Sequence, residues 1–437
     1  MSMCMDYQKR ARDMIPGMTQ LLSKRPDMFS LDVWPSFFSK ASGSSVWDLD
    51  GRQYLDMSIS GIGANVLGYA DPDVDGEVKL AIDKGVSSSL NCPEDVELAE
   101  LLCSLHPSFA EMVRYTRSGG EAMAVAVRIA RAKTRRDVVV FCGYHGWHDW
   151  YLAANVGTEN ALGEHLIPGL APNGVPKGLA GTSLPFRFNC IEELEALVSS
   201  HGRDLAAIVL EPIRDHEPTP DFVEAVRFFA DETGAVLIID EISSGFRLNS
   251  CGAHVLFGYR PDMAVFSKAM GNGYPIAAVV GKASVMEAAQ ESFISSTCWT
   301  ERVGPTAALA TIRKHARLEA AHRLISLGKS VQEGWAALLE KHGIRGHVGG
   351  MYPMSHFQFD YPDHLALKAY FVQLMLDQDI LASTLFYAMW AHRDEDVARY
   401  LEACDKAFSA IGEALSEGNV LSRLRGHVSV AGFHRLT

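Results

Sequence analysis

A single lysine follows a short apolar run, where an unpaired ammonium would be poorly solvated. Lys268 comes after the run 263–266, which is bounded by Pro261 and the turn-forming stretch 271–275, as expected of a buried strand. A charged amine in such a place is unfavourable unless it reaches water or a partner, or loses its proton. Lys268 is therefore either a solvated loop residue or a reactive amine, and its neighbours must distinguish the two.

Other residues that can do chemistry occupy similar places along the chain. Asp240 ends the run AVLIID, Ser118, Gly119 and Gly120 precede the helical stretch 121–133, and Tyr144 and His145 follow the run DVVVFCG. Ligands of parallel α/β sheets bind at the carboxyl ends of the strands, so these groups are expected to meet at one edge.

A lysine and a buried carboxylate at one sheet edge suit pyridoxal phosphate (PLP). Lys268 would form a Schiff base with the aldehyde, and burial would help by lowering the pKa of its amine. Once released, the same amine could serve as general base in the proton shift. Asp240 would pair with the pyridine nitrogen and keep it protonated, so that the ring accepts electrons from the substrate.

The remaining groups fit the rest of this cofactor. The amides of Gly119 and Gly120, at the positive end of a helix dipole, would hold the phosphate, and glycine allows close approach of the backbone. Ser118 belongs to the same cradle. Tyr144 would stack on one face of the ring and Ile242 would pack on the other.

Each signal has a plainer explanation when taken alone. Asp240 could cap a helix or bind a metal, and SGGE could be only a capping box at a helix start. His145, His148 and Asp149 could ligate a metal, but no distant histidine or acidic cluster obviously completes such a site, so no metal is expected. The conjunction of several signals, each at an expected strand end or helix start, favours PLP.

The elements that must position these residues follow from periodicity. Helical and strand-like runs alternate between about residues 71 and 310, which predicts a mainly parallel sheet covered by helices on both faces. Residues 1–70 form an N-terminal segment with a hairpin around Asp50-Gly51. Residues 311–437 are expected to be a C-terminal α+β domain, and Gly234 should end the helix that precedes AVLIID.

Composition excludes several classes of protein. The 437 residues carry a net charge of −13 and show no basic stripe, which argues against a nucleic-acid partner. No apolar run is long enough for a membrane span, and the charged N-terminus is unlike a signal peptide. Eight cysteines without CxxC spacing fit a reducing compartment, so a cytoplasmic location is expected.

The motifs SGGEAMAVAVRIARA, YHGWHD, LEPI, IIDEISSGFR and FSKAMGNGYPIAAVVG, in this order, resemble those of the class III PLP-dependent aminotransferases of fold type I. Within the class the chain looks most similar to the glutamate-1-semialdehyde 2,1-aminomutases. The resemblance implies an α/β fold with a mainly parallel central sheet, and a small α+β domain formed by the N- and C-terminal segments. It covers roughly residues 40 to 310.

Carried over to this chain, the resemblance makes Lys268 the Schiff-base lysine and Asp240 the partner of the ring nitrogen. It also places Glu211, in LEPI, near the cofactor, and His145, beside Tyr144, is expected in the same site. Thr300, five residues before Pro305, matches a threonine that reaches the phosphate of the neighbouring subunit, although Val303-Gly304 replaces the usual Gly-Asn. The resemblance thus implies a homodimer with shared active sites.

Two departures from the aminomutase pattern bear on the reaction. The N-terminal GGVNSPVR, whose arginine holds the substrate carboxylate, has no counterpart, and Arg25 nearby is either an anion anchor or, more commonly for such a residue, a solvated surface side chain. The stretch 381–392 lacks a carboxylate. These departures favour a two-substrate, ping-pong transaminase acting on an amino donor such as glutamate and a ketone or aldehyde acceptor. An aminomutase is the alternative, and the lysine with Asp240 disfavours a non-catalytic module.

Overall fold

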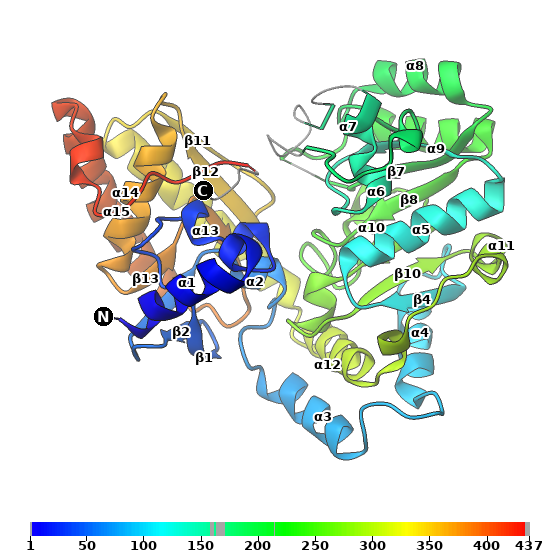
Figure 1. Cartoon of the computed structure of the whole chain (residues 1–437), viewed down its shortest axis with the longest axis horizontal. Helices are drawn as coiled ribbons and strands as arrows, with labels where there is room; N and C mark the ends of the chain where they lie inside the picture. The colour runs from blue at the N-terminus through cyan, green and yellow to red at the C-terminus, as the bar shows by residue number, and fades with distance from the viewer. Residues whose placement is uncertain (1, 158–160, 163–170, 214, 433–437) are drawn as a thin grey trace. The chain divides into compact units, whose positions relative to one another are not determined.

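The computed structural model describes residues 2–157, 161–162, 171–213 and 215–432 (Figure 1). The chain forms two compact units, one of residues 72–321 and one that combines residues 1–71 with 322–437. The N- and C-terminal segments therefore share one unit, while the three-part division of the chain near residues 70 and 310 stays a prediction.

The unit of residues 72–321 is built on a seven-stranded sheet. In sheet order its strands are β4 (Met112–Thr116), β10 (Ala277–Gly281), β9 (Met263–Phe266), β8 (Val236–Asp240), β7 (Leu205–Leu210), β5 (Val138–Cys142) and β6 (Ser183–Pro185). The predicted strands that flank Lys268 are therefore β9 and β10, and they are neighbours in the sheet.

Strand direction decides which residues meet at an edge. Strands β9, β8, β7, β5 and β6 are parallel, and β10 runs antiparallel to both β9 and β4. Strand β4 therefore points the same way as β9. The carboxyl ends of β4, β9, β8, β7 and β5 lie at the same edge, which confirms the mainly parallel sheet predicted from the sequence.

Helices cover both faces of this sheet, because successive strand residues point to opposite sides. One core contains Val139, Val209 and Ile238 with residues of α5, and the other contains Val140, Ile208 and Leu237 with residues of α8 and α9. The helices of this unit are α3 (Pro72–Asp83), α4 (Pro93–Leu105), α5 (Gly119–Thr134), α6 (Asp149–Leu152), α7 (Ala154–Gly157), α8 (Ile191–His201), α9 (Pro220–Thr233), α10 (Ala253–Phe257), α11 (Ala283–Met286) and α12 (Val303–Arg317).

The ends of the helices follow their sequence signals. Helix α5 begins with a full capping box, in which Ser118 and Glu121 satisfy each other's backbone N–H groups. Helix α9 ends at Gly234, whose φ of 68° lies in the left-handed region that glycine adopts without strain. Both helices are thereby fixed next to the strands that carry the candidate residues.

The other unit contains two smaller sheets and the remaining helices. One sheet has β1 (Phe38–Ser42), β2 (Ser45–Asp48), β3 (Gln53–Met57) and β13 (Ile380–Ala382), and the other has β11 (Gly346–Gly349), β12 (Met354–Phe359) and β14 (Leu385–Tyr387). Its helices are α1 (Met3–Met14), α2 (Ser60–Gly63), α14 (His364–Leu376), α15 (Asp394–Glu417) and most of α13 (Ala320–Lys341). The antiparallel pair β2–β3 is the hairpin predicted around Asp50-Gly51.

Arg25 corrects one expectation from the sequence. Its side chain is not solvated at the surface but buried, 6% exposed, where its Nε and Nη2 donate to the two carboxylate oxygens of Asp27 at 3.1 and 2.5 Å. The expectation of a solvated surface side chain was wrong because Asp27, two residues away, supplies the charge that lets a guanidinium leave water.

Among the described residues, no helix is both long enough and apolar enough to span a membrane.

Candidate active site

Lys268 lies two residues beyond the end of β9, with its backbone in the left-handed region at a φ of 47°. Such a conformation is strained for a residue with a side chain and persists where the surrounding structure enforces it. The half-buried side chain donates a hydrogen bond from Nζ to Ser243 Oγ at 2.8 Å. The lysine thus turns toward the residues that follow the neighbouring strand β8.

Burial lowers the pKa of Lys268 below its ordinary value, and the positive charge of Arg247 lowers it further. The carboxylates of Glu211 and Asp240 act in the opposite direction but do not cancel the effect. A larger fraction of this amine is therefore neutral near pH 7 than for a lysine in water, and a neutral amine is what a nucleophile needs.

Asp240 is the last residue of β8 and is almost fully buried. Its Oδ2 lies 2.7 Å from Nδ1 of His145, and its Oδ1 accepts a hydrogen bond from the backbone N–H of Ile242 at 3.0 Å. Among the described residues, Nε2 of His145 has no hydrogen-bond partner. The sequence placed both residues at this edge, and the structure joins them through a direct contact.

Glu211 directly follows β7, and its Oε2 accepts a hydrogen bond from the backbone N–H of Tyr144 at 3.1 Å. Gly143 has a φ of 128°, and a Cβ built there would lie 2.6 Å from the same carboxylate oxygen. A side chain at position 143 would therefore displace Glu211. Tyr144 itself is 40% exposed, and its ring lies edge-on to that of Tyr151, with 5.8 Å between the ring centroids.

The N-terminus of α5 is closely packed around its two glycines. A Cβ on Gly119 would lie 2.8 Å from Cδ1 of Ile242, and a Cβ on Gly120 would lie 3.3 Å from Cδ2 of His148. Gly146, with a φ of 100°, packs so tightly that its Cβ would lie 3.0 Å from the Cα of Gly120. The predicted phosphate cradle and the predicted ring-packing isoleucine are thus direct neighbours.

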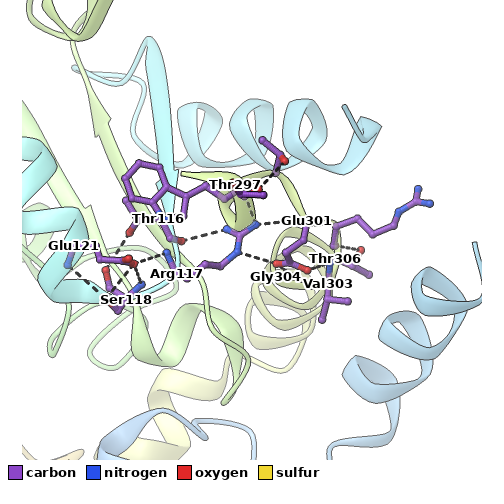
Figure 2. Close-up of polar contacts among 12 residues, drawn as sticks. Thr116, Arg117, Ser118, Glu121, Thr297, Glu301, Val303, Gly304 and Thr306 are labelled. Atoms are coloured by element: carbon purple, nitrogen blue, oxygen red, sulfur yellow. Dashed lines mark hydrogen bonds and ion pairs between the residues drawn. The ribbon is translucent and has the colours of Figure 1, made fainter. Parts of the chain in front are cut away.

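Arg117 connects this helix start to a distant part of the chain, as Figure 2 shows. Its Nη2 donates to the backbone carbonyls of Trp299 and Glu301, both at 2.9 Å, and its Nε lies 2.8 Å from Glu301 Oε1. Glu301 in turn accepts hydrogen bonds from the backbone N–H groups of Val303 and Gly304, at the start of α12. Arg117 therefore holds residues 299–304 against the start of α5.

In sequence, Thr300 lies between Trp299 and Glu301, whose backbone carbonyls Arg117 binds. Its side chain is exposed, and its hydroxyl donates to the backbone carbonyl of Thr297 at 3.2 Å. In the part of the chain that the structure describes, no hydrogen bond joins Thr300 to Lys268, Asp240 or the glycines of its own chain. The role assigned to it from the resemblance, in a neighbouring subunit, stays a prediction.

Three residues at this edge were missed from the sequence. Ser243 and Arg247 lie in the motif IIDEISSGFR, three and seven residues after Asp240. Their nearness to the end of this strand was the signal that could have placed them in the site. Arg117 directly precedes the capping serine, but its partner Glu301 is 184 residues away, and no local pattern predicts such a contact.

Comparison with known proteins gives a consistent picture. Residues 30–407 match the family described as Aminotransferase class-III. The chain is 32% identical over 401 residues to a glutamate-1-semialdehyde 2,1-aminomutase of Dechloromonas aromatica (strain RCB), covering 86% of this chain and 92% of that protein. It is 30% identical over 424 residues to a 3-aminobutyryl-CoA aminotransferase of Cloacimonas acidaminovorans (strain Evry), with coverages of 94% and 98%.

Solved structures agree with these relatives. The FumI protein of Sphingopyxis sp. MTA144, solved as a PLP internal aldimine form, has a TM-score of 0.85 at 25% identity and covers 97% of this chain and 98% of its own. An omega-transaminase from Sphaerobacter thermophilus has a TM-score of 0.81 at 27% identity, with coverages of 93% and 97%. The family match spans most of the chain, and we conclude that the protein belongs to the PLP-dependent class III aminotransferases.

Proposed function

We propose that Lys268, Asp240 and the start of α5 hold PLP, and that the protein moves an amino group from a small amino donor to a ketone or aldehyde acceptor by a ping-pong mechanism. The observation that carries this assignment is the amine of Lys268, which lies at the carboxyl edge of the sheet and experiences the charges of both Asp240 and Glu211.

The residues present fit this cofactor. Asp240 offers a carboxylate for the pyridine nitrogen and is itself oriented by His145 and the N–H of Ile242. Ile242 lies against Gly119, so the surface for one face of the ring adjoins the amides for the phosphate. Tyr144, held through its backbone by Glu211, offers an aromatic face for the other side. Ser118 contributes by capping α5 with Glu121.

When bound, PLP supplies an electron sink for the substrate's α-carbon. The chain's own residues then have separate tasks. Asp240 would hold a proton on the ring nitrogen, and the dipole of α5 would balance the phosphate charge. Lys268, whose pKa lies below its ordinary value, would accept a proton from the substrate's α-carbon and return it to the carbon on the other side of the amino nitrogen.

A two-substrate transaminase is favoured over an aminomutase for two reasons. An aminomutase must retain its intermediate while nitrogen moves between adjacent carbons. The aminomutases' N-terminal arginine motif and the carboxylate expected within residues 381–392 are both absent from this chain. Arg25, the nearby candidate for an anion anchor, already pairs with Asp27. The printed names of the relatives include both reaction types.

Incubation with glutamate 1-semialdehyde and no keto acid separates the two reactions. The product must be scored, because this substrate carries both an amine and an aldehyde and could serve a transaminase as donor and acceptor. A transaminase gives a dicarbonyl and a diamino product, whereas repeated formation of the isomer with the amino group moved to the former aldehyde carbon would show that the protein is an aminomutase. Glutamate is the default donor for a transaminase, and a panel of amines scored by the cofactor spectrum would identify the physiological one.

A homodimer with shared active sites is part of the proposal, because Thr300 is exposed and makes no described contact with the cradle of its own chain. Five exposed apolar side chains in the α3–α4 region offer a surface for a second copy, namely Leu80, Ile82, Val86, Leu90 and Val96. Sedimentation should give a dimer. We also propose a cytoplasmic location, on the cysteine usage described above.

Substitution of Lys268 tests the assignment of the site. The purified protein should show a visible absorption band of lysine-bound PLP, and this band should change when a competent amine is added. The Lys268→Ala variant should lack the band while keeping the fold by circular dichroism. A band of unchanged position and intensity in Lys268→Ala would refute the assignment of this lysine.

A further inference from the structure

Ser243 lies on the turn that follows β8, three residues after Asp240, and none of the roles described above uses its hydroxyl. Its Oγ accepts the hydrogen bond from Lys268 Nζ at 2.8 Å. Strands β8 and β9 are adjacent and parallel, with Asp240 opposite Val265, so the turns that follow them leave the sheet side by side. A residue on the first turn can therefore reach a lysine on the second.

The backbone around Ser243 is fixed from several directions. Its carbonyl accepts a hydrogen bond from Arg247 Nε at 2.7 Å, the preceding N–H of Ile242 donates to Asp240, and Gly245 N–H donates to the carbonyl of Glu241 at 2.8 Å. The Ser243 hydroxyl therefore stands in a defined position relative to the carboxylate of Asp240. A flexible lysine side chain gains a fixed end point from such a partner.

Of the two adjacent serines, only Ser243 has a hydrogen bond with Lys268 among the described contacts. Ser244 is buried and donates from its hydroxyl to Oε2 of Glu241 at 2.5 Å, and Glu241 also accepts from His254. Ser244 thus belongs to the buried support of the turn, whereas Ser243 faces the amine. The two hydroxyls, one residue apart, provide a natural comparison.

We propose that Ser243 is a positioning residue that holds the amine of Lys268 whenever this amine is not bonded to the cofactor, and that stabilises its protonated form during proton transfer. The inference rests on the proposed function. In the transfer step a C–H bond at the substrate α-carbon breaks, its proton forms an N–H bond on Lys268, and its electron pair passes to the bound cofactor. The new ammonium donates to Ser243 Oγ, and a hydrogen bond to a charged donor is stronger than one to a neutral donor.

The sign of the effect on protonation follows from this contact. The charged groups that act on Lys268 are Arg247, which disfavours the ammonium, and Glu211 and Asp240, which favour it. Ser243 adds a neutral acceptor that also favours the ammonium. Removal of its hydroxyl should lower the pKa of Lys268 and leave the side chain less well oriented.

PLP itself is the probe that tests this inference without a known substrate. Full-length protein freed of cofactor is mixed with PLP between pH 6 and 10, and the rate at which the visible band grows reports the neutral amine of Lys268. For Ser243→Ala, we expect the midpoint of this pH profile to fall by about one unit and the plateau rate to fall roughly tenfold. Ser243→Thr keeps the hydroxyl and should resemble the wild type in both measures.

Ser244→Ala is the matched control for the integrity of the turn. It should lower the thermal stability of the protein and leave the midpoint unchanged. A midpoint and plateau in Ser243→Ala equal to those of the wild type, or equal shifts in both serine variants, would overturn the role of Ser243. Growth of the same band in Lys268→Ala would instead overturn the proposed function, so the two failures are distinguishable.

Discussion

At the scale of single residues, the site depends on two carboxylates that neighbouring groups hold in place. Asp240 is oriented by His145, and Glu211 is fixed by the N–H of Tyr144. Lys268 experiences both of these carboxylates and the opposing charge of Arg247. Burial lowers the pKa of this lysine and so raises the fraction of neutral amine, and a single added or removed charge at this edge should change that fraction measurably.

The two glycines at the start of α5 should respond differently to an added methyl group. In Gly119→Ala the new Cβ would lie 2.8 Å from Ile242 Cδ1, so the isoleucine expected beneath the cofactor ring must move. In Gly120→Ala the nearest atom, in His148, is 3.3 Å away and needs a smaller shift. We expect the Kd for PLP to rise about tenfold in Gly119→Ala and by less than about threefold in Gly120→Ala.

Titration of the visible band with PLP measures both constants. The thermal stability of the cofactor-free variants serves as the control, because alanine favours the helix at either position. Equal Kd values for the two variants would show that the contact with Ile242 does not govern cofactor binding.

At the scale of elements, the start of α5 is joined to the start of α12 by side-chain contacts. Arg117 and Glu301 join them, with side chains only 13% and 18% exposed (Figure 2). Removal of one partner of such a pair leaves the other charge poorly solvated, which is more destabilising than the net value of the pair. Loss of Arg117 should loosen mainly residues 299–304, because its contacts hold this segment against the start of α5.

Amide hydrogen exchange measures this local effect. In Arg117→Ala, peptides that cover residues 297–306 should exchange at least about tenfold faster, while peptides from α9 keep their wild-type rates. Arg117→Lys retains the charge but cannot bind two carbonyls and a carboxylate together, so it should give an intermediate result. Wild-type exchange at residues 297–306 in Arg117→Ala would contradict this role.

The sequence predicts those features of the site that depend on local pattern. Asp240 and Lys268 follow apolar runs, and the direction of parallel strands then brings them to one edge. Ser118 and Glu121 have the spacing of a capping box. The contact of Arg117 with Glu301 and that of Lys268 with Ser243 were not predicted, because they depend on side-chain torsions and on tertiary neighbours. Arg25 was misjudged for the same reason, since burial of its partner Asp27 has no signature in sequence.

At the scale of the whole molecule, buried neutral histidines make stability dependent on pH. Burial lowers the pKa of His106 to about 3 and those of His315 and His392 to about 4. The unfolded chain binds protons at these groups below about pH 6.5, whereas the folded chain does not. The free energy of unfolding should therefore fall as the pH drops from about 6.5 toward 4.

His106 offers a direct check of this pH dependence. Its ring stacks on that of Phe266, with 5.0 Å between the ring centroids. Among the described residues, neither of its nitrogens has a hydrogen-bond partner. In His106→Phe, the slope of unfolding free energy against pH between 4 and 6 should decrease by about 1 kcal/mol per pH unit. Chemical denaturation at several pH values measures the slope, and an unchanged slope would contradict the proposed titration.

The left-handed backbone at Lys268 has a consequence for heat tolerance. Glycine adopts this conformation without strain. It also lacks the lysine amine, whose removal from water is unfavourable. We therefore expect cofactor-free Lys268→Gly to melt a few degrees above the cofactor-free wild type, although it cannot catalyse the reaction. Selection for activity would then keep this position less robust than it could be, so consensus or stability-guided engineering of this chain should leave residue 268 untouched.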